Sequence, residues 1–533
     1  MCIRDSKMKS FLLKFMLTGI CFLALALRLY ALSAQQPFWV DEFSSGTQAR
    51  IIQKHGIDLI FDSELRKQSS FEHHNIPAHA LIALSFKMFG EKEWAARLPF
   101  ALIGSLIPVL VFALLIGYGY STAGLIAAFL TAHAHIQILW SVQARGYMLL
   151  QATLLGSLYV YHRFMTVSHN KQKSLMLLFL ISVVGLLSHV TFVFMILALA
   201  IHYTWSTPKS SKRLLYVGIG SIGVVLIMFF TGSLSIFKTF ASQTFTPVNN
   251  IWYYHSFLWR HYTLVTFLGA LGLIRLTQKS PRTMTTPLLF IALYTIFILF
   301  IFGHHMTKYL LPIFPFLLAG TGYFIYEIAG LFTTKGTPRM LIGLAIAGSI
   351  IVNGNVFVSK PKKYLSLNTH FREIANIDYD TVYDLIKSKS SPETAIIETW
   401  PGRGLWYLGN DFRNLYMYRW ENETGFANGH EKKTTFYTLN GMKRISSQLG
   451  FVSTAQDLQE VEKLHPTGFI FIDDTSLPES VRMYAEKHFK KELYLDHYPL
   501  DDNPYSIWPA TLYSWGIEES LPVDNAPDTT TNP

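Results

Sequence analysis

An acidic pair, Asp41-Glu42, directly follows the first long apolar segment of the chain. A carboxylate at that depth in a membrane is costly unless it has a function, so the pair is a candidate site. Asp41 could act as a general base that takes a proton from an attacking hydroxyl or amine. Glu42 could orient an acceptor or a metal ion. The structural alternative is that the pair caps a helix expected from Ser44 to His55.

Other polar residues lie at the ends of later apolar segments. His73 and His74 precede one of these segments and could bind a metal ion, but the side chains of adjacent residues diverge, which disfavours a metal site. Binding of a lipid phosphate agrees better with this spacing. The alternative for one of the pair is a plain surface histidine. Arg145 is the only charge in a tight turn, and its planar guanidinium suits phosphate oxygens. The alternative for Arg145 is an interfacial arginine that snorkels beside Tyr147.

Two further segments complete the set. His189 lies in a turn that contains no Gly or Pro, where a structural role and a substrate contact are both open. Lys308-Tyr309 opens a late apolar segment, where the lysine provides a point charge. The candidate substrate-binding residues are Glu42, His73, His74, Arg145, Tyr147, His189, Lys308 and Tyr309.

The composition is that of a polytopic membrane protein. Half of the 533 residues are hydrophobic and only 15% are charged, against about 25% in soluble domains. The formal charge of +10 comes largely from short connections between apolar segments. This is the positive-inside pattern, so we do not expect nucleic acid as a partner. The two cysteines form no disulfide framework.

Apolar segments of about 20 residues predict membrane spans. The first is expected to be a retained span with Arg28 snorkelling to the interface, although a cleaved signal peptide is an alternative. The predicted spans, about eleven, are 10–32, 98–117, 121–141, 145–164, 174–188, 190–206, 214–232, 256–275, 285–303, 309–328 and 339–358.

Loop charge predicts the topology. The connections at 163–173 and 207–213 are both basic and are both expected to be cytoplasmic, so the chain crosses twice between them and turns near Ser188-His189. The N-terminus is then cytoplasmic, and the polar residues above gather at the outer face. The outer segment 33–97 is expected to hold an interfacial helix at 77–89.

Residues 1–9 are expected to be a cytoplasmic N-terminus, 10–358 a transmembrane domain, 359–521 an extracytoplasmic α/β domain and 522–533 a disordered tail. The α/β domain is predicted from alternating elements. The expected strands are 394–400, 468–473, 492–498 and 511–515, and the expected helices are 380–388, 455–464 and 478–490. No glycine loop that would cradle a nucleotide phosphate is present, which argues against an ATP-driven enzyme.

Several motifs together carry a resemblance over residues 10 to about 330. They are Asp41-Glu42, Gly90 through Trp94-Ala95-Ala96-Arg97-Leu98-Pro99, Gln143-Ala144-Arg145-Gly146-Tyr147, Ser188-His189 and Lys308-Tyr309-Leu310-Leu311-Pro312. In order and spacing they resemble the bacterial members of the protein O-mannosyltransferase-like group. This group belongs to the GT-C superfamily of glycosyltransferases, which also includes the lipid A aminoarabinose transferase.

The resemblance implies a sugar donor on polyprenyl phosphate, a base at Asp41 and outer basic residues that hold the phosphate. The chain departs from the pattern at Lys308, where Arg is frequent, and at Gln143, where Glu is frequent. Asn75-Ile76-Pro77 also replaces a Pro-Pro step. We therefore expect an inverting glycosyltransferase of a bacterial-type inner membrane that modifies a glycan, lipid or protein. Its partners would include membrane lipids, and a divalent metal ion is left open.

Two other functions are weighed against this one. A transporter or flippase of lipid-linked sugars predicts ionisable residues near the bilayer midplane and internal repeats. The charged groups here lie at the outer ends of spans, and no repeat is evident. A catalytically inactive relative that serves as a scaffold is the third possibility.

Overall fold

The computed structural model describes residues 2–33, 38, 40–56, 58–62, 65, 75–166, 170–206, 248–302, 306–354, 356–360, 378–399, 401–409, 414–418, 435–438, 441–444, 451–473, 478–495 and 510–517. Contacts divide them into a helical unit that ends at residue 360 and an α/β unit that begins at residue 378. The predicted span 214–232 and the predicted tail 522–533 lie outside the described residues.

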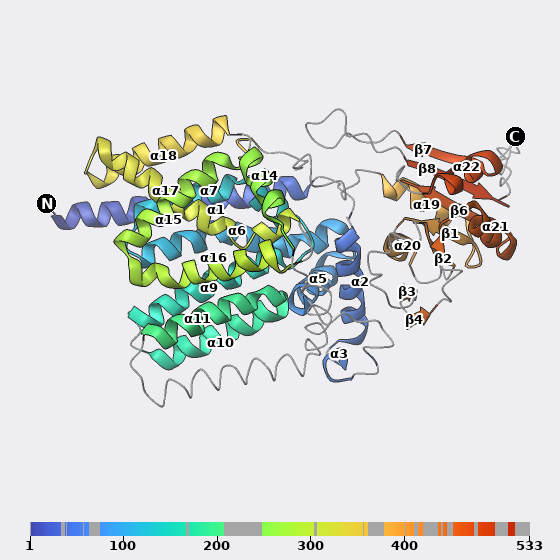
Figure 1. Cartoon of the computed structure of the whole chain (residues 1–533), viewed down its shortest axis with the longest axis horizontal. Coiled ribbons are helices and arrows are strands. Elements are labelled where there is room, and N and C mark those ends of the chain that lie inside the picture. Colours follow the sequence, from blue (N-terminus) through green and yellow to red (C-terminus); the bar gives the residue numbers. More distant parts are fainter. Residues whose placement is uncertain are drawn as a thin grey trace, which may run out of the picture. The chain divides into compact units, whose positions relative to one another are not determined.

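The helical unit contains long apolar helices that run side by side, with α2 lying across their ends (Figure 1). Its elements are α1 (Cys2–Leu32), α2 (Val40–His55), α3 (Asp58–Phe61), α5 (Ile76–Phe89), α6 (Glu93–Gly117), α7 (Ser121–His133), α8 (His135–Ser141), α9 (Tyr147–Thr166), α10 (Lys171–Ser188), η1 (Val190–Phe192), α11 (Val193–Ser206), α14 (Ile251–His261), α15 (Thr263–Lys279), α16 (Pro281–Phe300), η2 (Thr307–Leu310), α17 (Phe314–Phe332) and α18 (Gly336–Asn353).

Among the described residues, six helices are long and apolar enough to cross a membrane, or seven if the bent pair α14–α15 counts as one span. The polytopic helical class is therefore confirmed, and the total of about eleven spans stays a prediction. Shorter helices occupy further predicted positions, including α11 and the pair α7–α8. Helix α5 matches the apolar segment at 77–89 to within one residue.

The predicted span 121–141 is not one helix, because it breaks at Ala134. The chain that follows α18 pairs with this break: Ala134 forms an antiparallel bridge with Phe357. The amide of His135 donates to the Val356 carbonyl at 2.9 Å, and the amide of Val358 donates to the His133 carbonyl at 2.8 Å. The backbone groups that the break frees are thus satisfied by a segment distant in sequence, as a buried break inside a membrane requires.

The expectation that Arg28 snorkels to the interface is wrong. Its side chain is fully buried in the helical unit. Nε donates to the Ser141 hydroxyl at 3.0 Å, and Nη1 donates to the carbonyls of Ala24 at 3.0 Å and Ala132 at 3.4 Å. Ala132 lies in the last turn of α7, where the helix end leaves carbonyls without intrahelical donors. Arg28 therefore joins α1 to the broken helix.

The predicted span 256–275 is also broken. Helices α14 and α15 meet at Tyr262 with a bend of 103°. Helix α14 is amphipathic: Tyr254 and Phe257 are buried, whereas Trp252 and Trp259 are exposed. Exposed tryptophans of this kind favour the membrane–water interface, which gives a physical reason for the bend.

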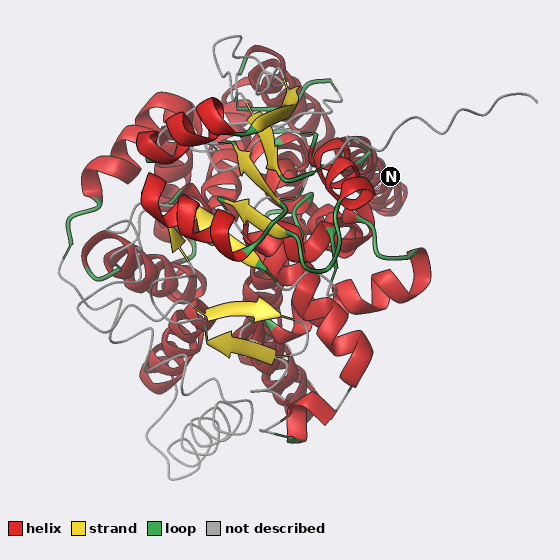
Figure 2. Ribbon diagram, turned by 90° about the vertical axis from the view of Figure 1, so that its right-hand side faces the viewer, coloured by secondary structure: helices red, strands yellow, loops and turns green. Residues whose placement is uncertain are grey.

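The α/β unit contains a mixed sheet, as the alternation of elements predicts. Its elements are α19 (Tyr379–Lys389), β1 (Ala395–Glu398), α20 (Pro401–Tyr407), β2 (Leu415–Tyr418), β3 (Thr435–Thr438), β4 (Gly441–Arg444), β5 (Phe451–Val452), α21 (Ala455–Leu464), β6 (Gly468–Ile472), α22 (Glu479–His488), β7 (Lys490–Leu495) and β8 (Ala510–Trp515). The sheet order is β5-β2-β1-β6-β8-β7, and β3–β4 form a separate antiparallel pair (Figure 2).

Helices cover both faces of this sheet. Along β1, the side chain of Ile397 packs in a hydrophobic core with residues of α21 and α22. The side chain of Ile396 packs in a second core with residues of α19. Strands β5, β2, β1 and β6 are parallel, whereas β8 and β7 are antiparallel to their neighbours. After β1 the chain first moves to β2 on one side and later to β6 on the other, so the strand order reverses between β1 and β6.

Candidate functional site

The acidic pair lies inside a helix and does not precede one. Helix α2 begins at Val40, so Asp41 and Glu42 occupy its first turn, and the expected start of a capped helix at Ser44 is wrong. The side chain of Asp41 lies outside the described residues. Carboxylates in a first helical turn are favoured by the helix dipole. The pair is therefore held where the local backbone favours negative charge.

Glu42 is buried and its carboxylate is engaged on both oxygens. Arg97 of α6 donates from Nε to Oε1 and from Nη2 to Oε2, each at 2.8 Å. The amide of Ala144 donates to Oε1 at 2.6 Å. Arg97 also lies 5.0 Å from the centre of the Phe38 ring. Glu42 thus fixes the start of α2 against α6 and the loop before α9, and its role in this geometry is to position that turn.

The loop before α9 is the meeting point of several segments. Arg145 is half-buried, and its Nη1 donates to the Ser45 hydroxyl at 3.3 Å, one turn along α2 from Glu42. Gly146 is closely surrounded: an added Cβ would lie 3.1 Å from the Asn75 side-chain oxygen and 3.2 Å from the Ser188 carbonyl. The loop therefore contacts α2, the start of α5 and the end of α10 at once.

Tyr147 and His189 lie next to each other beyond that loop. Their ring centres are 5.5 Å apart, and Tyr147 also packs edge-on against Trp140 at 5.3 Å. His189 Nδ1 accepts from the Thr191 amide at 3.3 Å and lies 2.7 Å from the Thr191 hydroxyl. This contact caps η1 and explains how the chain turns there without Gly or Pro.

Side-chain hydrogen bonds to backbone carbonyls hold the turn of Lys308 and Tyr309 beside α9. Lys308 is buried in η2, and its Nζ lies 5.7 Å from the centre of the Tyr309 ring. Gln151, one turn along α9 from Tyr147, donates to the Leu311 carbonyl at 2.5 Å. The Tyr294 hydroxyl donates to the Tyr309 carbonyl at 2.8 Å. These bonds hold the lysine-bearing turn at the same end of the bundle as the loop before α9.

All six candidates whose side chains are described thus gather at one end of the helical unit. They are Glu42, Arg145, Tyr147, His189, Lys308 and Tyr309. His73 and His74 lie outside the described residues, as does the side chain of Asp41. Within the described ranges no three His, Cys, Asp or Glu side chains come together to hold a metal ion.

Arg97 is a residue of the candidate site to which the sequence analysis assigned no role. It stands in the quoted Trp94–Pro99 motif, near the start of an apolar helix. A buried arginine in such a helix needs acceptors for its donors, and a carboxylate at the end of another apolar segment is the strongest one. That need is the signal that could have paired Arg97 with Glu42.

Residues 73–232 match the family model described as dolichyl-phosphate-mannose-protein mannosyltransferase. No curated protein matches the sequence. The crystal structure of ArnT from Cupriavidus metallidurans bound to undecaprenyl phosphate superposes with a TM-score of 0.58 at 12% identity, covering 93% of this chain and 97% of that chain. The chain has the GT-C fold.

Two further GT-C structures are similar over most of this chain. The Archaeoglobus fulgidus oligosaccharyltransferase tethered with an acceptor peptide has a TM-score of 0.55 at 12% identity, covering 92% of this chain and 73% of that chain. Archaeal AglB from the same organism, in complex with an inhibitory peptide and a dolichol-phosphate, has a TM-score of 0.53 at 12% identity, covering 97% and 75%. The predicted GT-C architecture is therefore confirmed.

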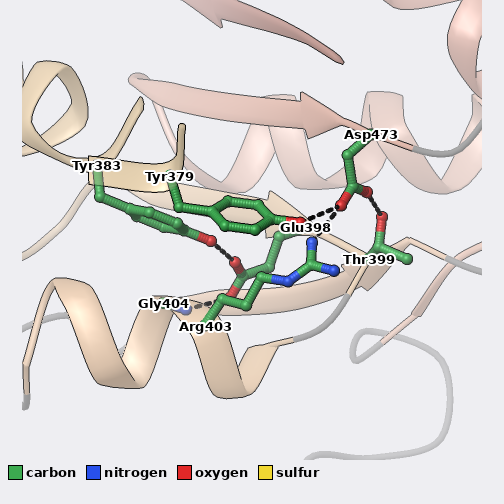
Figure 3. Close-up of polar contacts among 7 residues, drawn as sticks. All are labelled: Tyr379, Tyr383, Glu398, Thr399, Arg403, Gly404 and Asp473. Carbon is green, nitrogen blue, oxygen red and sulfur yellow. Dashed lines mark hydrogen bonds and ion pairs between the residues drawn. The ribbon is translucent and has the colours of Figure 1, made fainter. Parts of the chain in front are cut away.

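The α/β unit carries its own buried polar cluster, drawn in Figure 3. Asp473, which follows β6, accepts from Arg403, Thr399 and the Tyr379 hydroxyl. Glu398, at the end of β1, accepts from the Tyr383 hydroxyl and, at 2.9 Å, from the Gly404 amide.

The cluster lies at the carboxyl ends of β1 and β6, where the strand order reverses. In open α/β sheets this is the usual place for a ligand crevice. The described contacts nevertheless engage both carboxylates with protein donors, and they tie α19 and α20 to the sheet. Burial raises the pKa of Glu398 to about 7, although the bonds from Tyr383 and Gly404 and the charge of Arg403 oppose that rise.

The raised pKa predicts a pH-dependent stability for the α/β unit. Between about pH 4.5 and 7 the folded Glu398 holds a proton that the unfolded chain has lost, so rising pH lowers the stability through this window. Across this window the free energy of unfolding falls by roughly 3 kcal/mol. Glu398→Gln is expected to flatten this dependence, measured by hydrogen exchange of the β1 amides in the full chain at pH 5 and pH 8. Exposed Glu460→Gln is the control and should keep the wild-type slope; an equal slope in Glu398→Gln would contradict the assignment.

Proposed function

We propose that this protein transfers a sugar from a polyprenyl-phosphate donor to a glycan, lipid or protein acceptor at the outer face of a bacterial-type inner membrane. One observation carries the proposal: the turn with Asp41, the Arg145 loop and the Lys308 turn meet at one end of the helical unit. The GT-C structures with undecaprenyl phosphate and with dolichol-phosphate support a donor of this chemistry. The structures with an acceptor peptide and an inhibitory peptide are compatible with a protein acceptor.

In the proposed reaction Asp41 takes the proton from the acceptor hydroxyl or amine. The acceptor atom then attacks the anomeric carbon, and the bond from that carbon to the phosphate oxygen breaks with its electron pair on the phosphate. Attack opposite the leaving group inverts the configuration. Arg145 and Lys308 stabilise the charge that develops on the phosphate. Glu42 acts as a positioning residue, because its bonds to Arg97 and Ala144 hold the helical turn that carries Asp41.

A vesicle assay separates this function from its rivals. The full chain is reconstituted in vesicles that carry a labelled sugar-bearing polyprenyl phosphate in both leaflets, with envelope acceptors added outside. In a second preparation the donor starts in the inner leaflet alone, so that its movement can be followed. Transfer of sugar to the acceptor supports the proposal. Movement of the intact donor across the bilayer without transfer would instead support a transporter, and the absence of both activities would support a scaffold.

Arg145→Ala is expected to weaken donor binding about tenfold or more, because a charge-assisted hydrogen bond to phosphate is lost. The measurement is the dissociation constant for polyprenyl phosphate in detergent. Arg275→Ala is the control, because Arg275 is exposed near the end of α15, away from the candidate site. Unchanged donor affinity in Arg145→Ala would assign Arg145 to an interfacial role beside Tyr147.

A further inference from the structure

A second polar region lies at the opposite end of the helical unit. A cavity of about 640 Å³ opens between the last turns of α9 and α11 and the first turns of α16. Its volume falls within the range of roughly 300–1,000 Å³ that is typical of small-molecule sites. The candidate site lies at the start of α9 and the start of α11, so the length of these helices separates the two regions.

The walls of the cavity form a hydrogen-bonded frame. His202 is buried, with Nδ1 2.8 Å from the Tyr161 hydroxyl and Nε2 2.9 Å from the Ser206 hydroxyl. His162 Nε2 lies 2.8 Å from the Gly117 carbonyl. A carbonyl can only accept, so His162 carries its proton on Nε2 in this contact. The imidazoles are thereby fixed in orientation and line a preformed space.

The charge of the cavity is positive. Arg282 lines it from the first turn of α16, and the described lining residues include no Asp or Glu. Among the described residues no ion pair is recorded for Arg282, which is exposed. Thr283 follows it, with its hydroxyl bonded to the Ser280 carbonyl at 3.1 Å. The start of a helix adds partial positive charge to that of the guanidinium.

The lining is also partly apolar, because Leu158, Met165 and Pro287 face the same space. A site with a cation on one side and hydrocarbon on the other favours an amphiphile over a free ion. The surrounding connections are basic, with Arg163, Lys171 and Lys279 at this end of the helices. Basic pockets between membrane helices at the positive end are the places where anionic lipid headgroups bind.

We infer that this cavity binds the phosphate headgroup of an anionic phospholipid, with Arg282 as the principal contact. The lipid's glycerol and upper acyl chains lie against Leu158 and Pro287. Since no step of sugar transfer uses this end of the protein, the bound lipid stabilises the fold and takes no part in the reaction. Binding to the folded state alone raises the unfolding temperature as lipid concentration rises.

The test uses the purified full chain in detergent, with native mass spectrometry to count bound lipids. Phosphatidylglycerol and phosphatidylcholine are offered in equal amounts, and inorganic phosphate is offered in a separate arm. The wild type is expected to retain phosphatidylglycerol preferentially. Arg282→Gln is expected to reduce that preference about fivefold, the value of one basic residue near a lipid phosphate.

Two further variants make the result decisive. Thr283→Glu places a carboxylate in the cavity, where it should repel the lipid phosphate and abolish the preference for phosphatidylglycerol. The variant should still fold, because acidic residues in the first turn stabilise a helix. Arg275→Gln removes an exposed arginine outside the cavity and should keep the preference. The inference is overturned if Arg282→Gln and Thr283→Glu retain the wild-type preference, or if Arg275→Gln loses it equally. Competition by millimolar inorganic phosphate would also overturn it, in favour of a free phosphate.

Discussion

Asp41→Asn is expected to reduce sugar transfer by about 10²–10⁴-fold, the usual contribution of a positioned general base. The amide keeps the size of the side chain but cannot take the acceptor proton. Donor binding should be unchanged, because the proposal assigns the phosphate to Arg145 and Lys308. The measurement is single-turnover transfer from polyprenyl-phosphate sugar in reconstituted vesicles, together with the donor dissociation constant.

A matched control for this substitution lies in the same segment between α1 and α6. Asp58 begins α3, is exposed and has the same carboxylate chemistry. Asp58→Asn should leave transfer within about twofold of the wild type, because it removes a solvated charge that has no part in the reaction. Near-normal turnover of Asp41→Asn would remove Asp41 as the base, whereas loss of donor binding in this variant would give it a binding role.

Arg97→Met is expected to destabilise the helical unit by about 3–5 kcal/mol, because it leaves the Glu42 carboxylate buried without its counter-charge. Both side chains are almost fully buried, and they join segments 55 residues apart. Transfer should also fall, since the turn that carries Asp41 loses its attachment to α6. The free energy of unfolding in mixed detergent micelles measures the first effect.

The ion pair between half-buried Arg50 and exposed Glu91 provides the control. It joins α2 to the segment between α5 and α6. The distance of 2.7 Å from Arg50 Nε to Glu91 Oε2 is close to the 2.8 Å of the buried pair. Arg50→Met should cost no more than about 1 kcal/mol, because Glu91 remains solvated. The double variant Glu42→Gln with Arg97→Met should recover much of the stability, since glutamine still accepts from the Ala144 amide. A cost for Arg97→Met equal to that of Arg50→Met would show that the buried pair does not hold the turn.

The helices and the polar end of the bundle follow from local sequence. Hydropathy and loop charge locate α6, α9 and α10, and the basic connections imply a turn at Ser188-His189, where α10 ends. In the α/β unit, β6 and α21 are predicted to within one residue. Such features depend on residues close together in the chain, so periodicity and capping are sufficient to find them.

What could not be predicted depends on partners distant in sequence. The bond from Ala144 to Glu42 joins residues 102 positions apart, and no local pattern indicates it. The break at Ala134 requires the chain after α18, and the burial of Arg28 requires that break. In each case a polar group that looks costly in hydrocarbon is satisfied by a segment distant in sequence.

The pairing of Phe357 with Ala134 has a consequence for how the protein is made. His133 and Val358 are 225 residues apart, so at 5–20 residues per second the ribosome reaches the second about 10–45 s after the first. During that interval the interrupted helix exists without its final partner. We therefore expect the backbone groups at the break to bond to water or to an insertion chaperone until α18 and the residues after it have been synthesised.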